Sequence, residues 1–467
     1  MKRYITEELQ KYITEEHMPW HMPGHKRKAV FSDALEMKRV DIQSILSYAM
    51  KMDVTEVPGL DDLHHPKSII RQSMDELKKI YGAYESFYLV NGATSGIFTS
   101  IAACYDGQGG EIIVAANCHK SVRNAVKLLG LTEHIIEPDR MVAPDIYLSV
   151  NPAEVDRVCS AHPNARAIVL TSPTYEGVIS DIEKISKIAK QYNMYIIVDE
   201  AHGAHLPYMS GIHVEDMKLP ESAVYCGADL VVQSLHKTLP SLTQTAVLHN
   251  QCRELSEAVR KYLSVFMSSS PSYIMLASME NAVTWMSEAE KEIEKYLEEL
   301  QAFRTRIKKL KNINILTDIE YAYDPTRLVF WAGCGEDILS GTKLYRLLDE
   351  QGIVCEMAGL DYVVLISTVC DDGKSFDELY GALSRIDEAL ASECNGVSIY
   401  SQNPEIKSMS VGEYTAQINE LIGKTAEQDI YVYPPGIIIV AAGEEITAEK
   451  GDYLKRLASS GSRLQGL

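Results

Sequence analysis

The chain has 467 residues, of which 46% are hydrophobic and 24% are charged, and its formal net charge is −20. This length suits an enzyme of two or three globular domains, and the acidic balance argues against a protein that binds nucleic acid or anionic membranes. The first residues lack the apolar core of a signal peptide, no apolar run predicts a membrane span, and nine scattered cysteines without a C-x-x-C pair favour a reduced, cytoplasmic protein.

Residues 1–65 carry several prolines and histidines, and they predict an irregular arm with short helices. From about residue 70 the patterns typical of strands and helices alternate. The expected strands are 86–90, 111–115, 167–170, 195–198 and 230–232, and the expected helices run to about 104 after a turn at 92–96, from 119, and over 181–192. This alternation predicts an α/β fold with a mostly parallel sheet covered by helices on both faces.

A highly charged segment with helical periodicity at 280–311 predicts one long helix that leaves the large domain. The patterns beyond it predict strands at 327–331, 353–356 and 362–366 and helices at 338–350 and 376–390. We therefore expect an N-terminal arm at 1–70, a large domain at 71–305, a smaller α+β domain at 306–394 and a short C-terminal domain at 395–467.

The segment Ser234-Leu235-His236-Lys237 directly follows an apolar run that predicts a buried strand. Burial disfavours the charged ammonium form of a lysine, so the amine of Lys237 can act as a nucleophile. A second apolar run, Tyr195-Ile196-Ile197-Val198-Asp199, ends in a carboxylate. A lysine and an acid at the ends of two such strands are what pyridoxal phosphate (PLP) requires, although a lone lysine is more often a surface residue.

Two further segments follow predicted strands. In Gly92-Ala93-Thr94-Ser95-Gly96 small residues and the hydroxyls of Thr94 and Ser95 can hold a phosphate at a helix start, and the alternative is an ordinary helix cap. In Asn117-Cys118-His119-Lys120-Ser121 the imidazole of His119 can stack on a planar ring or exchange protons, and the alternative is a histidine bonded to nearby backbone.

The segment Asp199-Glu200-Ala201-His202-Gly203-Ala204-His205 lies where an open α/β sheet usually binds its ligand. Asp199 would pair with the pyridine nitrogen, and His202 would support Asp199 or contact the phenolic oxygen of the ring. The helicase box that the same letters suggest requires a P-loop, which the sequence lacks. No metal is expected, because His202 and His205 have neither the H-E-x-x-H spacing nor an obvious third ligand.

With these residues in place, the chain resembles the ornithine/lysine/arginine decarboxylases of PLP fold type I over nearly its whole length. Further matching stretches are His21-Met22-Pro23-Gly24-His25-Lys26, Asp53-Val54-Thr55-Glu56, Gly59-Leu60-Asp61-Asp62-Leu63, Ser172-Pro173-Thr174-Tyr175-Glu176-Gly177, Ser268-Ser269-Ser270-Pro271-Ser272-Tyr273 and Tyr433-Pro434-Pro435-Gly436. The chain is similar to the short, biosynthetic arginine decarboxylases, which lack an N-terminal flavodoxin-like domain.

The resemblance implies that Lys237 forms the Schiff base with PLP, that Asp199 binds the ring nitrogen and that His119 stacks on the ring. It implies phosphate contacts from Thr94, Ser95, Ser234 and His236, and from Ser269 and Ser270 of a neighbouring subunit, hence a homodimer or a dimer of dimers with shared active sites. Asp53 and Glu56 would lie at the mouth of the site, and the Tyr433–Gly436 segment and Glu444 by the substrate entrance. Family members usually have proline where Ile438 and Ala442 stand, so the entrance differs in detail.

The expected activity is a PLP-dependent carboxy-lyase of polyamine biosynthesis that converts a basic L-amino acid to its amine and CO2. Arginine, giving agmatine, is favoured, and lysine and ornithine stay open. Asp53, Glu56 and Glu444 are the candidates for binding the distal cation of the substrate. One alternative is a fold type I aminotransferase or another lyase, although 362–368 shows no arginine for a substrate carboxylate. The other, a non-enzymatic relic, has no need for Lys237, Asp199 and His119 together.

Overall fold

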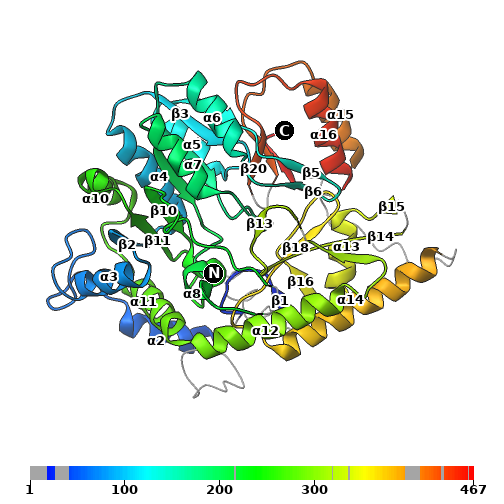
Figure 1. Cartoon of the computed structure of the whole chain (residues 1–467), viewed down its shortest axis with the longest axis horizontal. Helices are drawn as coiled ribbons and strands as arrows, with labels where there is room; N and C mark the ends of the chain where they lie inside the picture. Colours follow the sequence, from blue (N-terminus) through cyan, green and yellow to red (C-terminus); the bar gives the residue numbers. More distant parts are fainter. Residues whose placement is uncertain are drawn as a thin grey trace.

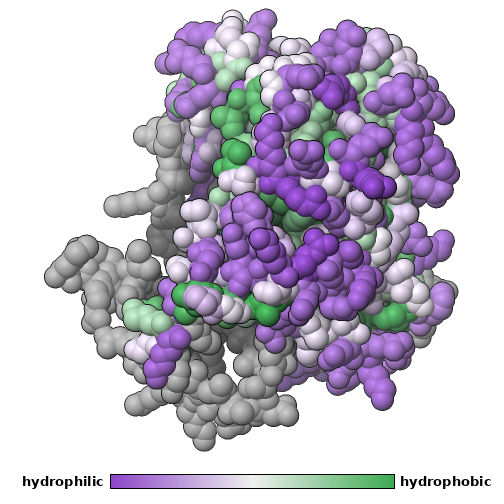
Figure 2. Space-filling view, turned by 90° about the vertical axis from the view of Figure 1, so that its left-hand side faces the viewer, coloured by the Kyte–Doolittle hydropathy of each residue, from purple (hydrophilic) through white to green (hydrophobic). Residues whose placement is uncertain are grey.

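The computed structural model describes residues 18–26, 42–214, 217–317, 319–334, 337–394, 411–432, 436–460 and 462–467. They form a large sheet with its helices at the left of Figure 1, a smaller α/β layer at the lower right and a C-terminal unit at the upper right. Hydrophilic side chains dominate the face that Figure 2 shows, as expected of a strongly charged chain. Within the described ranges, no helix is both long and apolar enough to cross a membrane.

The largest sheet has seven strands in the order β2-β11-β10-β9-β7-β3-β4. Its strands are β2 (Glu85–Leu89), β3 (Glu111–Ala115), β4 (Thr132–Ile136), β7 (Ala165–Thr171), β9 (Tyr195–Asp199), β10 (Leu230–Gln233) and β11 (Ala246–Asn250). The pairings from β10 through β9, β7 and β3 to β4 are parallel, and β11 and β2 are antiparallel to their neighbours. The predicted mostly parallel α/β sheet is thus confirmed.

Helices cover both faces of this sheet. The helices α4 (Gly92–Tyr105), α5 (Lys120–Leu128) and α10 (Ser256–Phe266) lie on one face, and α6 (Pro152–Ala161) and α7 (Ile182–Gln191) lie on the other. Successive strand residues therefore enter different cores, as Ile196 and Ile197 do. A Cβ atom on Gly96 would lie 2.6 Å from Leu89 and 2.8 Å from Val232, so glycine allows α4 to pack tightly on the sheet.

The smaller sheet consists of β12 (Ile313–Ile315), β14 (Arg327–Cys334), β15 (Asp337–Ile338), β17 (Met357–Ala358) and β18 (Val363–Ile366), packed with α13 (Gly341–Asp349) and α14 (Gly373–Cys394). The C-terminal unit has the strands β19 (Ile430–Val432), β20 (Ile437–Val440) and β21 (Leu464–Gln465) and the helices α15 (Val411–Leu421) and α16 (Ala448–Ser459), which share a core of their own. The domain limits expected from the sequence stay a prediction, because 395–410 lie outside the described residues.

Shorter elements connect these units. They are β1 (Met18–Trp20), α2 (Ile42–Met52), α3 (Ile69–Ile80), β5 (Arg140–Val142), β6 (Asp145–Tyr147), β8 (Val178–Ile179), α8 (Leu206–Met209), α9 (Leu235–Thr238), the 3-10 helix η1 (Arg253–Leu255), β13 (Ala322–Tyr323) and β16 (Ile353–Cys355). The strand β1 pairs with β16 in a separate two-stranded sheet, and β16 lies against β18 and α13, so the arm is joined to the smaller domain. Lys26 strengthens this junction, because its buried ammonium donates to the backbone oxygens of Pro19, His21 and Ile366.

Three expectations are corrected. Residues 92–96 are not a turn but the first turn of α4. The single helix expected at 280–311 is two helices, α11 (Tyr273–Glu288) and α12 (Glu290–Ile307), separated at Ala289, where neither Gly nor Pro marks the break. The strand β1 was not foreseen, because three residues are too few to show a period.

Candidate active site

A cavity of about 310 Å³ lies at the carboxyl ends of β7, β9 and β10. The strand register explains why these ends meet, because Thr171 and Val232 both pair with Asp199. The polar side chains predicted from the sequence that line the cavity are those of Thr94, His119, Asp199, His202, Ser234, His236 and Lys237. The sequence analysis therefore named seven polar side chains of this one cavity, and they come from four separate segments.

The amine of Lys237 is in contact with His202. Its Nζ atom lies 3.0 Å from Nε2 of His202, while Nη2 of Arg327 donates to Nδ1 of the same imidazole at 3.2 Å and to its backbone oxygen at 2.9 Å. Arginine can only donate, so Nδ1 of His202 must be the acceptor, and a neutral His202 carries its proton on Nε2. An N–H at Nε2 requires an acceptor, so this arrangement selects the neutral amine of Lys237.

Burial produces the pKa shifts of the same groups. It lowers the pKa of Lys237, with Asp199 and Glu356 opposing the shift, and it lowers the pKa of His202 well below its usual value, helped by Lys237 and Arg327. Burial also raises the pKa of Asp199, against the opposing charge of Lys237. The lowered pKa of Lys237 favours its neutral amine, which is the form that a nucleophilic lysine requires.

His119 is the N-cap of α5, and its Nδ1 accepts from the backbone N–H of Ser121 at 3.2 Å. Burial, with Lys237 and Lys120, lowers the pKa of His119 to about 4, so the imidazole is neutral near pH 7. The C-terminal unit reaches this residue directly. The backbone of Ile437 pairs with His119, and Ile437 lines the cavity.

Thr94 is exposed at the start of α4 and lines the cavity. Ser95 is buried, and its hydroxyl donates to the backbone oxygen of Gly92 at 2.8 Å. Ser95 does not belong to the lining, so the structure does not bring its side chain together with the others. Ser234 and His236 do line the cavity, and Nδ1 of His236 donates to the backbone oxygen of Thr245 at 3.1 Å.

Besides Ser95, five predicted residues lie outside the cavity lining of the single chain. Ser269 and Ser270 are exposed, although the backbone N–H of their neighbour Ser268 donates to Oδ1 of Asn91, the N-cap of α4. Asp53 and Glu56 are also exposed. Glu444 lines a different cavity and forms an ion pair with Lys450. Of the segment expected at the substrate entrance, Tyr433, Pro434 and Pro435 lie outside the described residues.

The cavity also contains acidic and aromatic residues that the sequence analysis did not assign. The hydroxyl of Tyr175 donates to Oε1 of Glu356, and the Tyr175 ring lies edge-on to the ring of His202, with their centroids 4.5 Å apart. Glu356 also accepts a hydrogen bond from the backbone N–H of Met22 at 2.9 Å. Glu176 is buried and accepts from Tyr362 at 2.6 Å. Tyr175 and Glu176 were quoted within a matching stretch, but nothing in the sequence joined them to Glu356.

The donor set fits PLP. The cavity combines the half-buried amine of Lys237, the buried carboxylate of Asp199, a neutral imidazole and a helix start with a hydroxyl. Two buried polar atoms of its lining, Oδ1 of Asn117 and Oγ1 of Thr171, have no hydrogen-bond partner among the described residues. Unsatisfied buried atoms are costly, so these two indicate a site built for a polar ligand.

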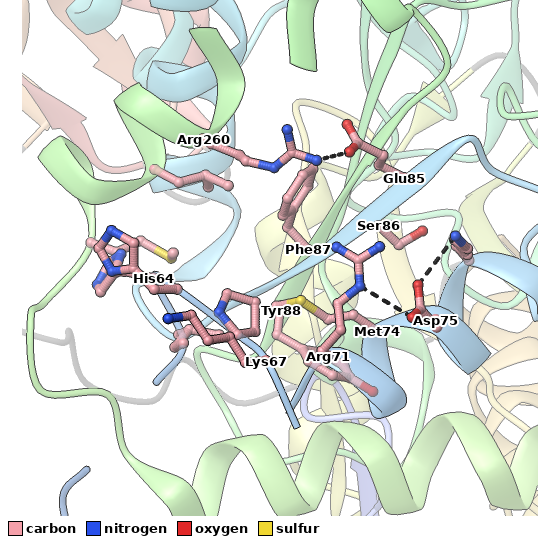
Figure 3. A pocket seen from close by; sticks show the side chains of 16 residues that line it. His64, Lys67, Arg71, Met74, Asp75, Glu85, Ser86, Phe87, Tyr88 and Arg260 are labelled. Carbon is pink, nitrogen blue, oxygen red and sulfur yellow. Dashed lines mark hydrogen bonds and ion pairs between the residues drawn. The ribbon is translucent and has the colours of Figure 1, made fainter. Parts of the chain in front are cut away.

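A second cavity, of about 320 Å³, lies beside α3 and β2 (Figure 3). Basic side chains dominate its polar lining, but Arg71 is bonded to Asp75 and Arg260 to Glu85. It contains no lysine paired with a buried acid at the carboxyl ends of strands, so it lacks the arrangement that PLP requires.

The family model described as "Orn/Lys/Arg decarboxylase, major domain" matches residues 4–323, and that of the C-terminal domain matches residues 403–467. The chain is 32% identical to the uncharacterized protein YaaO of Bacillus subtilis, covering 96% of this chain and 92% of that protein. It is 30% identical to the arginine decarboxylase of Bacillus subtilis, covering 98% and 94%. The constitutive lysine decarboxylase of E. coli has the same fold, with a TM-score of 0.70, 18% identity and coverage of 99% and 80%.

The fold neighbours confirm the predicted PLP-dependent fold type I, with its smaller and C-terminal domains. The predicted class, a PLP-dependent amino-acid decarboxylase, is confirmed as well. The chain belongs to the Orn/Lys/Arg decarboxylase family.

Proposed function

We propose that this protein binds PLP in the cavity at Lys237 and decarboxylates a basic L-amino acid, arginine by preference, releasing agmatine and CO2. The observation that carries the proposal is the half-buried amine of Lys237, which contacts the buried His202 and lies within the electrostatic influence of the buried Asp199. The preference for arginine is supported by the 30% identity to an arginine decarboxylase along the whole chain. A cytoplasmic location and a role in polyamine biosynthesis belong to the same proposal.

In this proposal Lys237 would hold PLP covalently, Asp199 would face its ring nitrogen and His119 would stack on the ring. Thr94, Ser234 and His236 would hold its phosphate. When bound, PLP supplies an electron sink for the bond that breaks as CO2 leaves.

The residues of the chain carry out the proton transfers and the orientation. Asp199, buried as a carboxylate, would keep a proton on the ring nitrogen, because an ionised partner in a dry site favours the positive form. Lys237 or His119 would deliver a proton to the Cα atom after CO2 has left. Either group would need its protonated form for that role. The low pKa of His119 makes that form scarce at neutral pH, and the neutral amine of Lys237 would first have to take up a proton.

Glu356 and Glu176 would recognise the distal cation of the substrate. Both carboxylates line the cavity, whereas Asp53, Glu56 and Glu444 do not line it in the single chain. Tyr175 and Tyr362 hold the two carboxylates in place through hydrogen bonds. A guanidinium can bind a carboxylate through two parallel N–H groups, which an ammonium cannot do.

The activity test incubates the PLP-loaded protein with L-arginine, L-lysine or L-ornithine and identifies the amine, the CO2 and any keto acid. We expect agmatine and CO2 in equal amounts, with arginine the best of the three by kcat/KM. Release of a keto acid without CO2 would instead identify an aminotransferase. Lys237→Ala should lose the visible absorbance of bound PLP, and Lys187→Ala, which changes an exposed lysine, should keep it.

Shared active sites are part of the proposal. Ser269 and Ser270 are exposed in the single chain, and Ser268 next to them is bonded to the N-cap residue of the proposed phosphate-binding helix α4. Mixing inactive Lys237→Ala chains with weakly active Ser270→Ala chains should then restore activity in hybrid dimers, because each hybrid contains one intact site. An unshared site predicts no gain on mixing.

A further inference from the structure

Three potential metal ligands meet at the amino-terminal end of β3, at the far end of this strand from His119. Glu111 is the first residue of β3, His134 lies in the neighbouring strand β4, and His162 is the C-cap of α6. One ligand atom from each lies within 4.8 Å of the other two. The three residues come from three different elements, so their convergence is a property of the fold.

One carboxylate oxygen faces both imidazoles. Oε2 of Glu111 lies 2.8 Å from Nε2 of His134 and 4.0 Å from Nδ1 of His162. The two rings are stacked, with centroids 3.5 Å apart and an angle of 16° between their planes. A proton can bridge Glu111 and His134, but the 4.0 Å separation is too long for a second hydrogen bond. A hydrogen bond therefore explains why His134 lies beside Oε2 of Glu111. It does not explain why His162 faces the same oxygen.

The surrounding contacts hold these ligands in position. The hydroxyl of Tyr105 donates to the backbone oxygen of Glu111 at 2.6 Å, and Nδ2 of Asn164 approaches its Oε1 at 3.4 Å. The backbone of His162 donates to Val158 and accepts from Ala165, which pairs with Glu111 across the sheet. Partners of this kind orient a metal ligand before the ion arrives.

We propose that Glu111, His134 and His162 bind a divalent transition-metal ion of the zinc class. Two imidazole nitrogens and one carboxylate oxygen suit Zn²⁺, whereas Mg²⁺ and Ca²⁺ prefer oxygen ligands alone. Ligand bonds of about 2.1 Å in a tetrahedral site place the donor atoms about 3.4 Å apart. The two separations from Oε2 of Glu111, 2.8 and 4.0 Å, lie on either side of this value, and the two stacked rings would have to turn apart so that both nitrogens face the ion.

The exposure of the three side chains gives the ion access from solvent. Glu111 is 30% exposed, His134 20% and His162 34%. Water would therefore complete the coordination. Such an ion would join the edge strand β4 to β3 and to the end of α6, and it would stabilise the folded chain by an amount that grows with the logarithm of its free concentration above the Kd. The site is separate from the proposed PLP site, which is at the opposite end of β3.

The spacing of the ligands explains why the sequence analysis expected no metal. His134 and His162 follow Glu111 by 23 and 51 residues, and no two of the three lie within one helix or one tight loop. The pairing of β3 with β4 and with β7 is needed to bring them together.

The test titrates ZnCl2 into the PLP-loaded protein and measures heat and the shift in melting temperature. We expect one tight equivalent per chain and a rise in melting temperature. His134→Ala, His162→Ala and Glu111→Gln should each weaken this binding about tenfold or more. His65→Ala is the matched control, because His65 is exposed and lies 3.3 Å from the single carboxylate of Asp62.

The variants leave the proposed active site untouched, so their decarboxylase activity should be retained and would report correct folding. Cobalt(II) provides a second readout, since a visible absorbance band of bound Co²⁺ should appear in the wild type and weaken in His162→Ala. Zinc binding of unchanged affinity in all three variants, or no stoichiometric zinc in the wild type, would overturn the proposal.

Discussion

Nη2 of Arg327 donates to Nδ1 of His202 at a distance of 3.2 Å, and both side chains are buried. Because this contact leaves the proton of a neutral His202 on Nε2, the imidazole can donate to the neutral amine of Lys237 at 3.0 Å. Through His202, the protonation state of Lys237 thus depends on Arg327, which lies at the start of β14 in the smaller sheet. His202 then acts as a positioning residue for Lys237.

Replacing His202 by Phe should raise the pKa of Lys237 in the PLP-free protein, because the neutral amine loses a hydrogen-bond donor. One hydrogen bond corresponds to roughly 1 pKa unit. The measurement is the pH dependence of Lys237 labelling by an amine-reactive reagent, followed by mass spectrometry. His202→Gln retains an N–H donor and should shift the pKa much less. An unchanged labelling profile in His202→Phe would show that the contact has no such role.

Glu356→Gln should lower kcat/KM for arginine by about 10-fold to 100-fold, since a charge-assisted hydrogen bond contributes about 1.5–3 kcal/mol. The loss should lie mainly in KM if Glu356 binds the distal cation of the substrate. Steady-state kinetics with arginine provide the measurement. Glu444→Gln is the control, because Glu444 lies in another cavity and is paired with Lys450. An equal loss in both variants would argue for a general effect of surface charge.

Sequence patterns predicted that the side chains of Lys237, Asp199 and His119 would lie together, but they did not predict the acidic side chains that line the same cavity. Lys237, Asp199 and His119 follow buried strands, and parallel strands bring their carboxyl ends to one edge, so local patterns were enough. Glu356 lies between β16 and β17 and lines the cavity, whereas Arg327 lies in β14 and contacts His202; both approaches depend on how two domains pack. The hydrophobic periodicity of a sequence does not predict how two domains pack.

The break between α11 and α12 at Ala289 is a second feature that sequence patterns did not predict. The segment has continuous helical periodicity and no helix-breaking residue, so the sequence predicts one helix. The structure has two, and the buried side chain of Ala289 separates α11, which packs near α3, from α12, which packs on α14. Tertiary packing decided this boundary.

Gly436→Ala should impair catalysis through His119. Gly436 has φ of +104°, and an added Cβ atom would lie 3.4 Å from Nε2 of His119. Gly443→Ala is a matched control, because Gly443 has φ of +85° but no atom near the added Cβ. Both variants should lose roughly 1–3 kcal/mol of stability through backbone strain. Only Gly436→Ala should also change kcat and the absorbance of bound PLP, and equal kcat values in the two variants would contradict this role of the C-terminal unit.

The stability of the folded chain should fall with acidification partly because of His249. This residue is fully buried between Tyr81 and the core of the sheet, and burial lowers its pKa from the usual 6.5 to about 3. The unfolded chain therefore binds a proton below pH 6.5 that the folded chain does not accept, so the stability present above pH 6.5 is lost as the pH falls toward 3.

The expected loss from this one residue between pH 7 and pH 5 is about 2 kcal/mol. Urea unfolding at the two pH values measures it. His249→Gln should reduce the difference between them by that amount, although the variant itself will be less stable because Gln fills the site differently. His213→Gln, which changes an exposed histidine, should leave the difference unaltered. If His249→Gln preserves the full pH dependence, the acid sensitivity must arise from other buried groups.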